Sequence, residues 1–468
     1  MGGYFHWFSA NEAICGVGPL GMTSLHHCIL VLSLSLARAV ASVKPRVVVV
    51  GGGVGGLFAA AKLVKLGNDV MLLEQNSVCG GRLGSETLLG TYRFDVGPSL
   101  MLLPDVYRDA FQQLGEDLEN HVETLEVNDP QYRVFFEISE KDLTKVVALL
   151  SFQNLYIGLC PSETPAVFSL LQALEFEKGI FYPKCGFSGI ANSLTSIATK
   201  LGVKITTNCK VTSLAQASDG TVRLETERDG NIVCDRVILN VDLPEAEETL
   251  VDESSRDTVA ELRPSCAIVQ LHFALSKRID ALAHHSLFLS SAPERESWST
   301  IRSPDSASWD PSAFNFYVHS PSRTDPTSCP EGHDAMTILV PVPPLPQSSS
   351  TKKRPSLEEQ AELVTRVRNA VLKRLEPACG EDISPFIVAE KSREALSWNA
   401  EYGLFRGQAF GLSHNLRQLS LLRPGIAHPK LSSVFRVGAS TRPGNGVPLC
   451  LVSGRLAAEA VQASHGPG

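Results

Sequence analysis

The chain has 468 residues, of which 43% are hydrophobic and 20% are charged, as in an ordinary soluble globular protein. This length suits two domains, or one large α/β body with insertions. The net charge of -8 and the pI near 5.9 argue against a nucleic-acid partner. They leave contact with a membrane open, because an apolar patch carries no charge.

The eleven cysteines are scattered, with no C-x-x-C pair and no paired spacing. This distribution is typical of buried or free thiols, and not of a disulfide framework or a zinc site. It also lacks the close dithiol that a disulfide oxidoreductase needs. We therefore expect a reducing compartment and no metal site.

The first 43 residues differ in character from the rest. Cys28–Ala37 is an apolar run that is too short to span a bilayer, and Ala37–Ala41 offers small residues at alternate positions, as a cleavage site does. No Lys or Arg precedes Arg38, so the basic region of a signal peptide and the Arg-rich character of a transit peptide are missing. We interpret residues 1–43 as a degenerate targeting leader or a disordered N-terminus, outside the fold.

The first elements after this leader follow a β-α-β pattern. Arg46–Val50 is a run rich in β-branched residues, typical of a buried strand. A helix is predicted over Leu57–Leu66 with Gly67 at its C-terminal end, and a second strand over Asp69–Glu74.

Helices and strands continue to alternate, which predicts an α/β protein. We expect strands over Val203–Thr207, Val222–Thr226 and Arg236–Asn240, helices over Ser188–Leu201 and Leu357–Leu375, an exposed loop over Pro343–Glu358, and a strand, turn and helix over Ser433–Ser453.

A glycine-rich turn lies between the first strand and the first helix. Its glycines at positions 51, 53 and 56 match G-x-G-x-x-G, where they allow a tight turn, close approach of a pyrophosphate and close packing of helix on strand. Glu74 ends the second strand, where a carboxylate accepts hydrogen bonds from ribose hydroxyls, and an acid there disfavours the 2′-phosphate of NADP. The residues expected to contact a dinucleotide are Gly51, Gly53, Val54, Gly55, Gly56 and Glu74.

A second glycine pair follows this acid closely. Gly80 and Gly81 precede Arg82, whose guanidinium can reach phosphate oxygens, and Gly97-Pro98 gives a further tight bend. This extension beyond the ribose acid favours FAD over NAD.

The block from Glu74 to Arg82 resembles the extended FAD motif of the flavin amine oxidase and carotene desaturase superfamily. Phe94–Ser99 is most similar to the bacterial- and fungal-type phytoene desaturases within it. Other blocks match that family in order: Ser151–Tyr156, Pro165–Val167, Phe181–Phe187, Leu282–His285, Pro330–Gly332, Pro341–Pro343, Gly407–Leu412 and Val437–Pro448.

The resemblance spans about residues 45–465 and implies a Rossmann-like FAD-binding domain of the glutathione-reductase type with an interleaved α+β substrate domain. The implied FAD-binding parts are residues 44–130, 182–250 and 426–468, and the substrate parts are residues 131–181 and 251–425. It also implies that Val211 meets adenine through its backbone, and that the C-terminal turn with Gly438, Gly446, Val447 and Pro448 meets the flavin ring.

Two departures from the family pattern stand out. Cys185 replaces the usual glycine of a Y-P-x-G-G block. Family members also carry a long, mostly helical insertion before the counterpart of Ser151, whereas here only Phe135–Leu150 fills that place. The substrate domain is therefore expected to be shortened at 135–150.

Several single residues carry weaker signals. His284 and His285 could line a substrate tunnel, although a packed or surface position is the more common fate of such a pair. Asp242 follows a strand, and a turn cap is favoured over a catalytic acid. No H-E-x-x-H, P-loop or G-x-S-x-G motif is present, and no catalytic residue is assigned.

The resemblance implies oxidation of carbon–carbon bonds in a long apolar polyene by bound FAD. We expect quinone or dioxygen as electron acceptor, since a second G-x-G-x-x-G for a nicotinamide donor is missing. We also expect peripheral contact with a membrane of a plastid or other organelle, or at the cytoplasmic face.

Three other functions remain open. One is a carotenoid or retinoid isomerase or saturase that uses reduced FAD and needs supplied electrons. A second is a truncated FAD-binding protein without activity, which the short 135–150 segment supports. The third, an amine oxidase, is disfavoured because Ser440–Pro448 follows the desaturase pattern and offers no aromatic pair to cage an amine.

Overall fold

The computed structural model describes residues 44–128, 130–136, 152–257, 262–290, 292–303, 308–311, 313–347 and 352–465. The expected leader, residues 1–43, lies outside this part of the chain, and so does nearly all of the shortened segment 135–150. The described residues from Pro45 onward form one compact unit.

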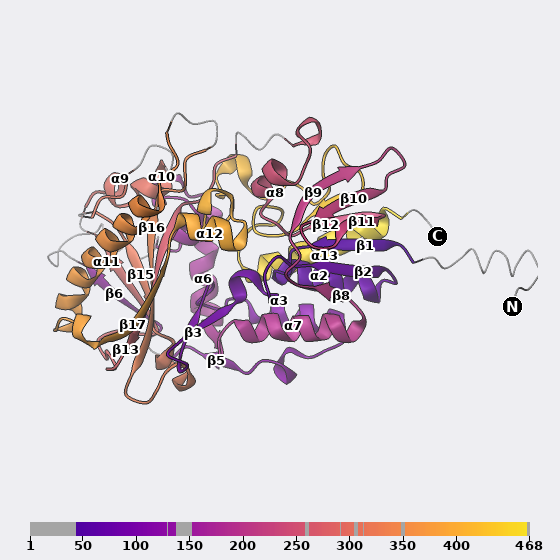
Figure 1. Cartoon of the computed structure of the whole chain (residues 1–468). Helices are drawn as coiled ribbons and strands as arrows, with labels where there is room; N and C mark the ends of the chain where they lie inside the picture. Colours follow the sequence, from indigo (N-terminus) through magenta and orange to yellow (C-terminus); the bar gives the residue numbers. More distant parts are fainter. Residues whose placement is uncertain are drawn as a thin grey trace, which may run out of the picture. The chain divides into compact units, whose positions relative to one another are not determined.

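A five-stranded parallel sheet has the strand order β18-β12-β1-β2-β8 (Figure 1). Its strands come from three distant stretches of sequence, all of which fall within the parts expected to bind FAD. They are β1 (Arg46–Val50), β2 (Asp69–Leu73), β8 (Lys204–Thr206), β12 (Arg236–Leu239) and β18 (Val434–Arg436).

The buried strand β1 contributes apolar side chains to both faces of this sheet, because successive side chains point to opposite sides. Val47 and Val49 pack in one apolar cluster with the helices, whereas Val48 and Val50 pack in another with a second, three-stranded sheet. That antiparallel sheet has the order β11-β10-β9, with β9 at Val211–Gln216, β10 at Val222–Thr226 and β11 at Gly230–Cys234.

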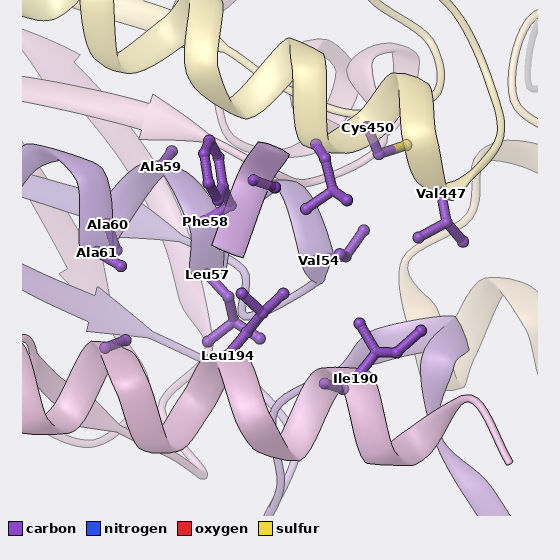
Figure 2. Packing of buried hydrophobic residues seen from close by; sticks show 14 of the residues in the cluster. Val54, Leu57, Phe58, Ala59, Ala60, Ala61, Ile190, Leu194, Val447 and Cys450 are labelled. Atoms are coloured by element: carbon purple, nitrogen blue, oxygen red, sulfur yellow. The ribbon is translucent and has the colours of Figure 1, made fainter. Parts of the chain in front are cut away.

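Three helices pack together on the Val47 face (Figure 2). They are α2 (Val54–Lys65), α7 (Ser188–Leu201) and α13 (Val447–Ala463), and the short helix α3 (Pro104–Leu114) joins the same cluster. Figure 2 shows Leu57 of α2 facing Leu194 of α7, with α13 on the opposite side of α2. Helix α2 begins three residues earlier than expected, because the glycine-rich turn passes directly into its first turn.

A six-stranded sheet forms the second half of the unit, in the order β17-β13-β16-β15-β14-β6. Its pairs are antiparallel except for β14 with β6. The strands are β6 (Tyr132–Phe136), β13 (Ala267–Leu275), β14 (His285–Leu289), β15 (Phe316–His319), β16 (Asp334–Val342) and β17 (Ile387–Arg393).

Helix α11 (Leu357–Cys379) lies against this sheet (Figure 1) and buries Val367, Val371 and Leu375 on it. It runs four residues past the expected end at Leu375, because Pro377 stands in its last turn and removes only one hydrogen bond there. The remaining α-helices are α5 (Asn154–Ile157), α6 (Ser169–Lys178), α8 (Leu243–Thr249), α9 (Glu294–Ser297), α10 (Ser299–Arg302) and α12 (Ala395–Tyr402). Two further antiparallel pairs join β3 (Ser85–Leu88) with β4 (Tyr92–Asp95) and β5 (Thr124–Glu126) with β7 (Phe181–Pro183).

The predicted fold class is confirmed: a Rossmann-like parallel sheet with covering helices, built from discontinuous segments, alternates with a mixed sheet. The residue limits assigned to the two domains stay a prediction.

The contact between α2 and α13 depends on glycine. A Cβ at Gly454 would lie 2.5 Å from the carbonyl oxygen of Gly55. We expect Gly454→Ala to lower the free energy of unfolding by about 1–3 kcal/mol, because the helices must move apart. Gly189→Ala in α7 is the matched control, since a Cβ there meets nothing within 4 Å. Chemical unfolding of both variants measures this, and equal stabilities would contradict the close contact.

Candidate active site

A cavity of about 870 Å³ lies at the carboxyl ends of β1, β2 and β12. In open parallel sheets this edge is the usual place for a ligand. Of the sixteen residues that the sequence predicts to bind the cofactor, all except Gly56 line this cavity. They are Gly51, Gly53, Val54, Gly55, Glu74, Gly80, Gly81, Arg82, Gly97, Pro98, Val211, Gly438, Gly446, Val447 and Pro448.

The glycine-rich turn forms part of the cavity wall and leaves no room for side chains at two of its glycines. A Cβ at Gly56 would be 2.3 Å from the carbonyl oxygen of Gly51, and one at Gly53 would be 2.7 Å from the amide nitrogen of Asn240. Gly51 also has a φ of +100°, which favours glycine. Gly56 therefore keeps helix and strand close, and its neighbours leave the backbone open to a ligand.

Glu74 stands at the end of β2 and is almost fully buried. Its two carboxylate oxygens accept hydrogen bonds from the backbone N–H groups of Gly52, at 2.7 Å, and Asn76, at 2.8 Å. Burial raises the pKa of this carboxyl, and the two backbone hydrogen bonds oppose that rise. Each oxygen keeps further lone pairs that can accept hydroxyl donors at the cavity wall.

The segment with Gly80 and Gly81 packs against the glycine-rich turn that follows β1. Gly80 donates its N–H to the carbonyl of Gly52 at 2.8 Å and has a φ of +122°. Arg82 extends to the carbonyl of Ala409, 2.5 Å from its Nη1. A Cβ at Gly97 would lie 2.5 Å from the carbonyl oxygen of Arg82, so this packing explains the tight bend there.

Two helices point their N-terminal ends at the cavity. Helix α2 follows Gly53 and α13 follows Gly446, and residues of the first turn of each line the wall. The free N–H groups and the dipole of a helix N-terminus favour negative charge. Val211, at the start of β9, lines the same cavity.

Arg423 is a residue that the sequence does not single out. Its side chain is fully buried, and its guanidinium donates hydrogen bonds to the backbone carbonyls of Leu412, Ser413, Gln418, Ala439 and Thr441. Burial lowers the pKa of Arg423 to about 10. This cation fixes the C-terminal turn to the segment that faces it, and no local sequence pattern marks such a role.

Asp242 corrects the expectation of a turn cap. It stands before α8, yet its carboxylate makes no capping bond. Instead it accepts hydrogen bonds from Ser440 Oγ at 2.5 Å, Gln408 Nε2 at 2.7 Å and the N–H of Phe405 at 3.1 Å. Donors from two segments that are distant in sequence, Phe405–Gln408 and Ser440, compete for this carboxylate more effectively than the adjacent helix turn.

The histidine pair is buried and lies outside the residues that line the cavity, which confirms the packed interpretation. Nε2 of His284 lies 3.1 Å from that of His319, and Nδ1 of His285 lies 2.6 Å from the hydroxyl oxygen of Tyr317. Burial lowers the pKa of His284 to about 3, so this ring is neutral. In the described ranges no three His, Cys, Asp or Glu side chains are placed to hold a metal ion, and the nine described cysteines are free.

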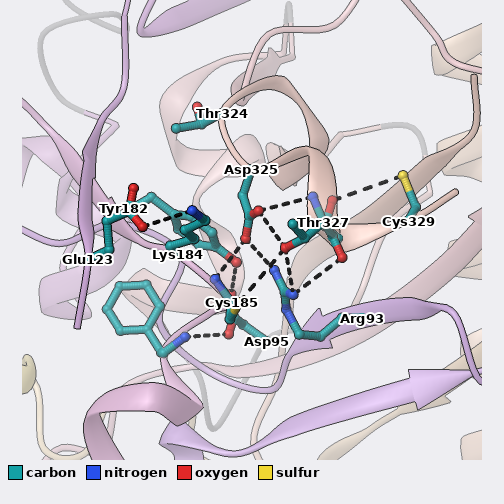
Figure 3. Close-up of polar contacts among 12 residues, drawn as sticks. Arg93, Asp95, Glu123, Tyr182, Lys184, Cys185, Thr324, Asp325, Thr327 and Cys329 are labelled. Atoms are coloured by element: carbon teal, nitrogen blue, oxygen red, sulfur yellow. Dashed lines mark hydrogen bonds and ion pairs between the residues drawn. The ribbon is translucent and has the colours of Figure 1, made fainter. Parts of the chain in front are cut away.

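The glycine that the family usually has at Cys185 is explained by the backbone. Cys185 has a φ of +64°, and its N–H donates to Asp325 at 2.8 Å (Figure 3). Asp325 also pairs with Arg93 at 2.6 Å, and Tyr182 donates to the buried Asp95 at 2.5 Å. The surrounding polar network therefore holds a cysteine in a conformation that suits glycine better.

These features fit FAD. The glycine-rich turn presents its backbone at the cavity wall without intervening side chains, two helix N-termini supply N–H donors for phosphate and for a carbonyl of the flavin, and Glu74 supplies acceptors for ribose hydroxyls. The cavity continues past the dinucleotide end along apolar side chains, as a flavin and a second reactant require.

Glu74 provides a direct test. In Glu74→Gln one oxygen becomes an NH₂ group that faces the N–H of Gly52 or Asn76, and the negative charge is lost. We expect FAD to bind more weakly by about 1.5–3 kcal/mol, or roughly 10- to 150-fold in Kd. Titration of apoprotein with FAD measures this, with Glu362→Gln on the exposed side of α11 as control. Unchanged affinity in Glu74→Gln would contradict the role.

Comparison with known proteins agrees with this geometry. Residues 46–249 match the family described as FAD dependent oxidoreductase. The phytoene desaturase of Fusarium fujikuroi is 28% identical, with 91% of this chain and 90% of the relative covered. The zeta-carotene-forming phytoene desaturase of Myxococcus xanthus is 29% identical, with 88% and 93% covered.

The alignment with the Fusarium protein spans 520 positions, more than the 468 residues of this chain, so that relative has residues without a counterpart here. Among solved structures, an oxidoreductase from Methanosarcina mazei has the same fold, with a TM-score of 0.59 at 16% identity over 88% of this chain and 100% of the other. Fold, site and sequence relatives agree: the chain is an FAD-dependent oxidoreductase that is similar to phytoene desaturases over about 90% of its length.

Proposed function

We propose that the chain oxidises carbon–carbon single bonds of a carotenoid precursor such as phytoene to double bonds. The observation that carries this proposal is the apolar continuation of the cavity beyond the dinucleotide end. Its wall there is formed largely by aliphatic and aromatic side chains, including Ile157, Phe168, Leu171, Leu174, Ile268, Leu339, Trp398, Phe410 and Leu419. A long hydrocarbon without charged groups suits such a wall, because burial of its apolar surface is the main source of affinity.

The relatives support the substrate class. Those named above are a phytoene desaturase and a zeta-carotene-forming phytoene desaturase, and a carotenoid 3,4-desaturase of Haloarcula japonica is 26% identical over 89% of this chain. These names describe desaturation of polyenes of one chemical class.

Different residues would bind the cofactor at one end of the cavity and the hydrocarbon at the other. Bound FAD would supply the acceptor for a hydride from the carbon that is oxidised. We propose that the fifteen predicted residues that line the cavity, from Gly51 to Pro448, would hold it, while Gly56 keeps α2 close behind them. The apolar wall excludes water and holds the hydrocarbon against the flavin end, and such positioning can supply most of the catalysis when the substrate offers no acidic proton.

The electrons must then leave the site. We propose quinone or dioxygen as the acceptor, because the sequence has one G-x-G-x-x-G and offers no second site of this kind for a nicotinamide. A quinone would reach the flavin from the same lipid phase as the hydrocarbon.

Peripheral membrane contact is proposed from exposed apolar side chains beside the cavity wall. Leu170 and Phe176 of α6 are 58% and 84% exposed, while Phe168 and Leu171 nearby line the cavity. The ring of Phe168 lies 5.7 Å from that of His414, whose segment continues to the exposed Leu416, Leu421 and Leu422. These side chains would insert into a lipid surface and let the substrate enter without crossing water.

No helix in the described part of the chain is long and apolar enough to cross a membrane. We propose a membrane of a plastid or another organelle, with the cytoplasmic face of a membrane as the alternative. The apolar run Cys28–Ala37 motivates this choice and lies outside the described residues.

Conversion of phytoene tests the function. The FAD-loaded protein is incubated with phytoene in liposomes that contain a quinone, and the carotenoids are separated and identified by their absorption spectra. We expect products with a longer conjugated chain. Conversion only after reduction of the flavin would favour the isomerase or saturase, and FAD binding with no change in any carotenoid would favour the inactive FAD-binding protein.

Membrane contact has its own test. We expect Phe176→Glu to weaken sedimentation with liposomes by about tenfold or more, because a charge replaces a large apolar side chain at the surface. Val233→Glu is the matched control, since Val233 is an exposed apolar residue on β11, in a different sheet. Equal binding of both variants would place the lipid contact elsewhere.

A further inference from the structure

The buried face of α6 consists of a single acidic residue. Glu175 is the one residue of this helix that is buried, and it lines the cavity. Its neighbours Phe176 and Glu177 are exposed. A carboxyl that the fold turns inward, at the wall of an apolar cavity, costs free energy unless it has a role or strong partners.

The partners of Glu175 are neutral groups. Gln153 donates from Nε2 to Oε2 at 2.9 Å, and the hydroxyl of Tyr132 donates to Oε1 at 3.5 Å. The amide of Gln172 donates in turn to Gln153 Oε1 at 3.3 Å, which fixes the orientation of Gln153. Within the described ranges no cation is paired with this carboxylate. Burial therefore dominates and raises the pKa of Glu175 to about 7.

The groups that face Glu175 from other elements, and the ring of His285 that lies against Tyr132, do not exchange protons near neutral pH. Burial raises the pKa values of Tyr132, Tyr156 and Tyr317 well above their usual range, and burial lowers the pKa of His285 well below its usual range. The hydroxyl of Tyr156 and Nε2 of His285 are buried and have no hydrogen-bond partner among the described residues. Glu175 is thus the group of this cluster whose charge changes near pH 7.

The proposed reaction needs such a group. Conversion of a CH–CH bond to C=C breaks two C–H bonds: one hydrogen leaves with its electron pair as a hydride to FAD, and the other leaves as a proton. The electron pair of the second C–H bond forms the new π bond. A dry apolar cavity offers no water to take that proton, so a base must be supplied by the chain.

We propose that the carboxylate of Glu175 is the catalytic residue that accepts this proton, with Gln153 and Tyr132 as positioning residues. This role rests on the proposed desaturation. Each turnover leaves Glu175 protonated, and the proton must return to solvent before the next one.

Glu175→Gln tests this role, with Glu177→Gln, an exposed acid on the same helix, as matched control. We expect Glu175→Gln to keep its FAD content and melting temperature and to lose about 100-fold or more in desaturation rate. The rate of the wild type and of Glu177→Gln should fall as the pH drops through about 7, where Glu175 gains a proton. The residual rate of Glu175→Gln should lack this dependence. Glu175→Asp should keep a reduced, pH-dependent rate.

An infrared titration adds a readout that does not need turnover. The C=O stretch of protonated Glu175 should appear as the pH drops through about 7 in the wild type and in Glu177→Gln. Burial also raises the pKa of Glu245 to about 7 and that of Asp95 to about 6, so the band of Glu175 is the part of the signal that the wild type shows and Glu175→Gln lacks. Desaturation by Glu175→Gln at the wild-type rate and with the wild-type pH profile would overturn this role and leave the proposed function intact. A wild type that converts no carotenoid would overturn both.

Discussion

The structure depends on the close approach of three backbone segments at the carboxyl end of β1. Gly56 lies so near the carbonyl of Gly51 that a Cβ would be 2.3 Å from it, and the amide of Asn240 donates to the same carbonyl at 3.1 Å. Any larger side chain here would push α2 away from the sheet. The N-terminus of α2, the cavity wall and the contact with α13 all follow from this one constraint.

The second helix N-terminus reaches the cavity through the same kind of contact. Gly55 of α2 and Gly454 of α13 bring the two helices together, so that α13 begins beside the glycine-rich turn although nearly 400 residues separate them. Arg423 and Asp242 then hold the turn before α13 through buried polar contacts, one to backbone carbonyls and one to Ser440. Segments near residue 50 and near residue 447 thus build one cofactor site, next to an apolar wall at which α6 turns the carboxyl of Glu175 inward.

Much of this site could be predicted from sequence because its chemistry depends on local patterns. Glycine spacing after a strand and an acid at the end of the next strand are visible in one stretch of sequence, and the resemblance supplied the C-terminal turn. Roles set by long-range contacts could not be predicted in this way. The guanidinium of Arg423 donates hydrogen bonds only to backbone carbonyls. The carboxylate of Asp242 accepts hydrogen bonds from residues distant in sequence and not from its own helix. The carboxylate of Glu175 points into the protein, where Gln153 and Tyr132 donate hydrogen bonds to it.

The central claim is that hydride passes from a carotenoid precursor to the bound flavin. It is tested most directly by mixing FAD-loaded protein with phytoene in liposomes, without oxygen or quinone, and following flavin absorbance and product together. The account predicts that the flavin is bleached and that one new double bond forms for each flavin reduced. Flavin that stays oxidised in the presence of phytoene, in a protein whose flavin dithionite reduces, would contradict it.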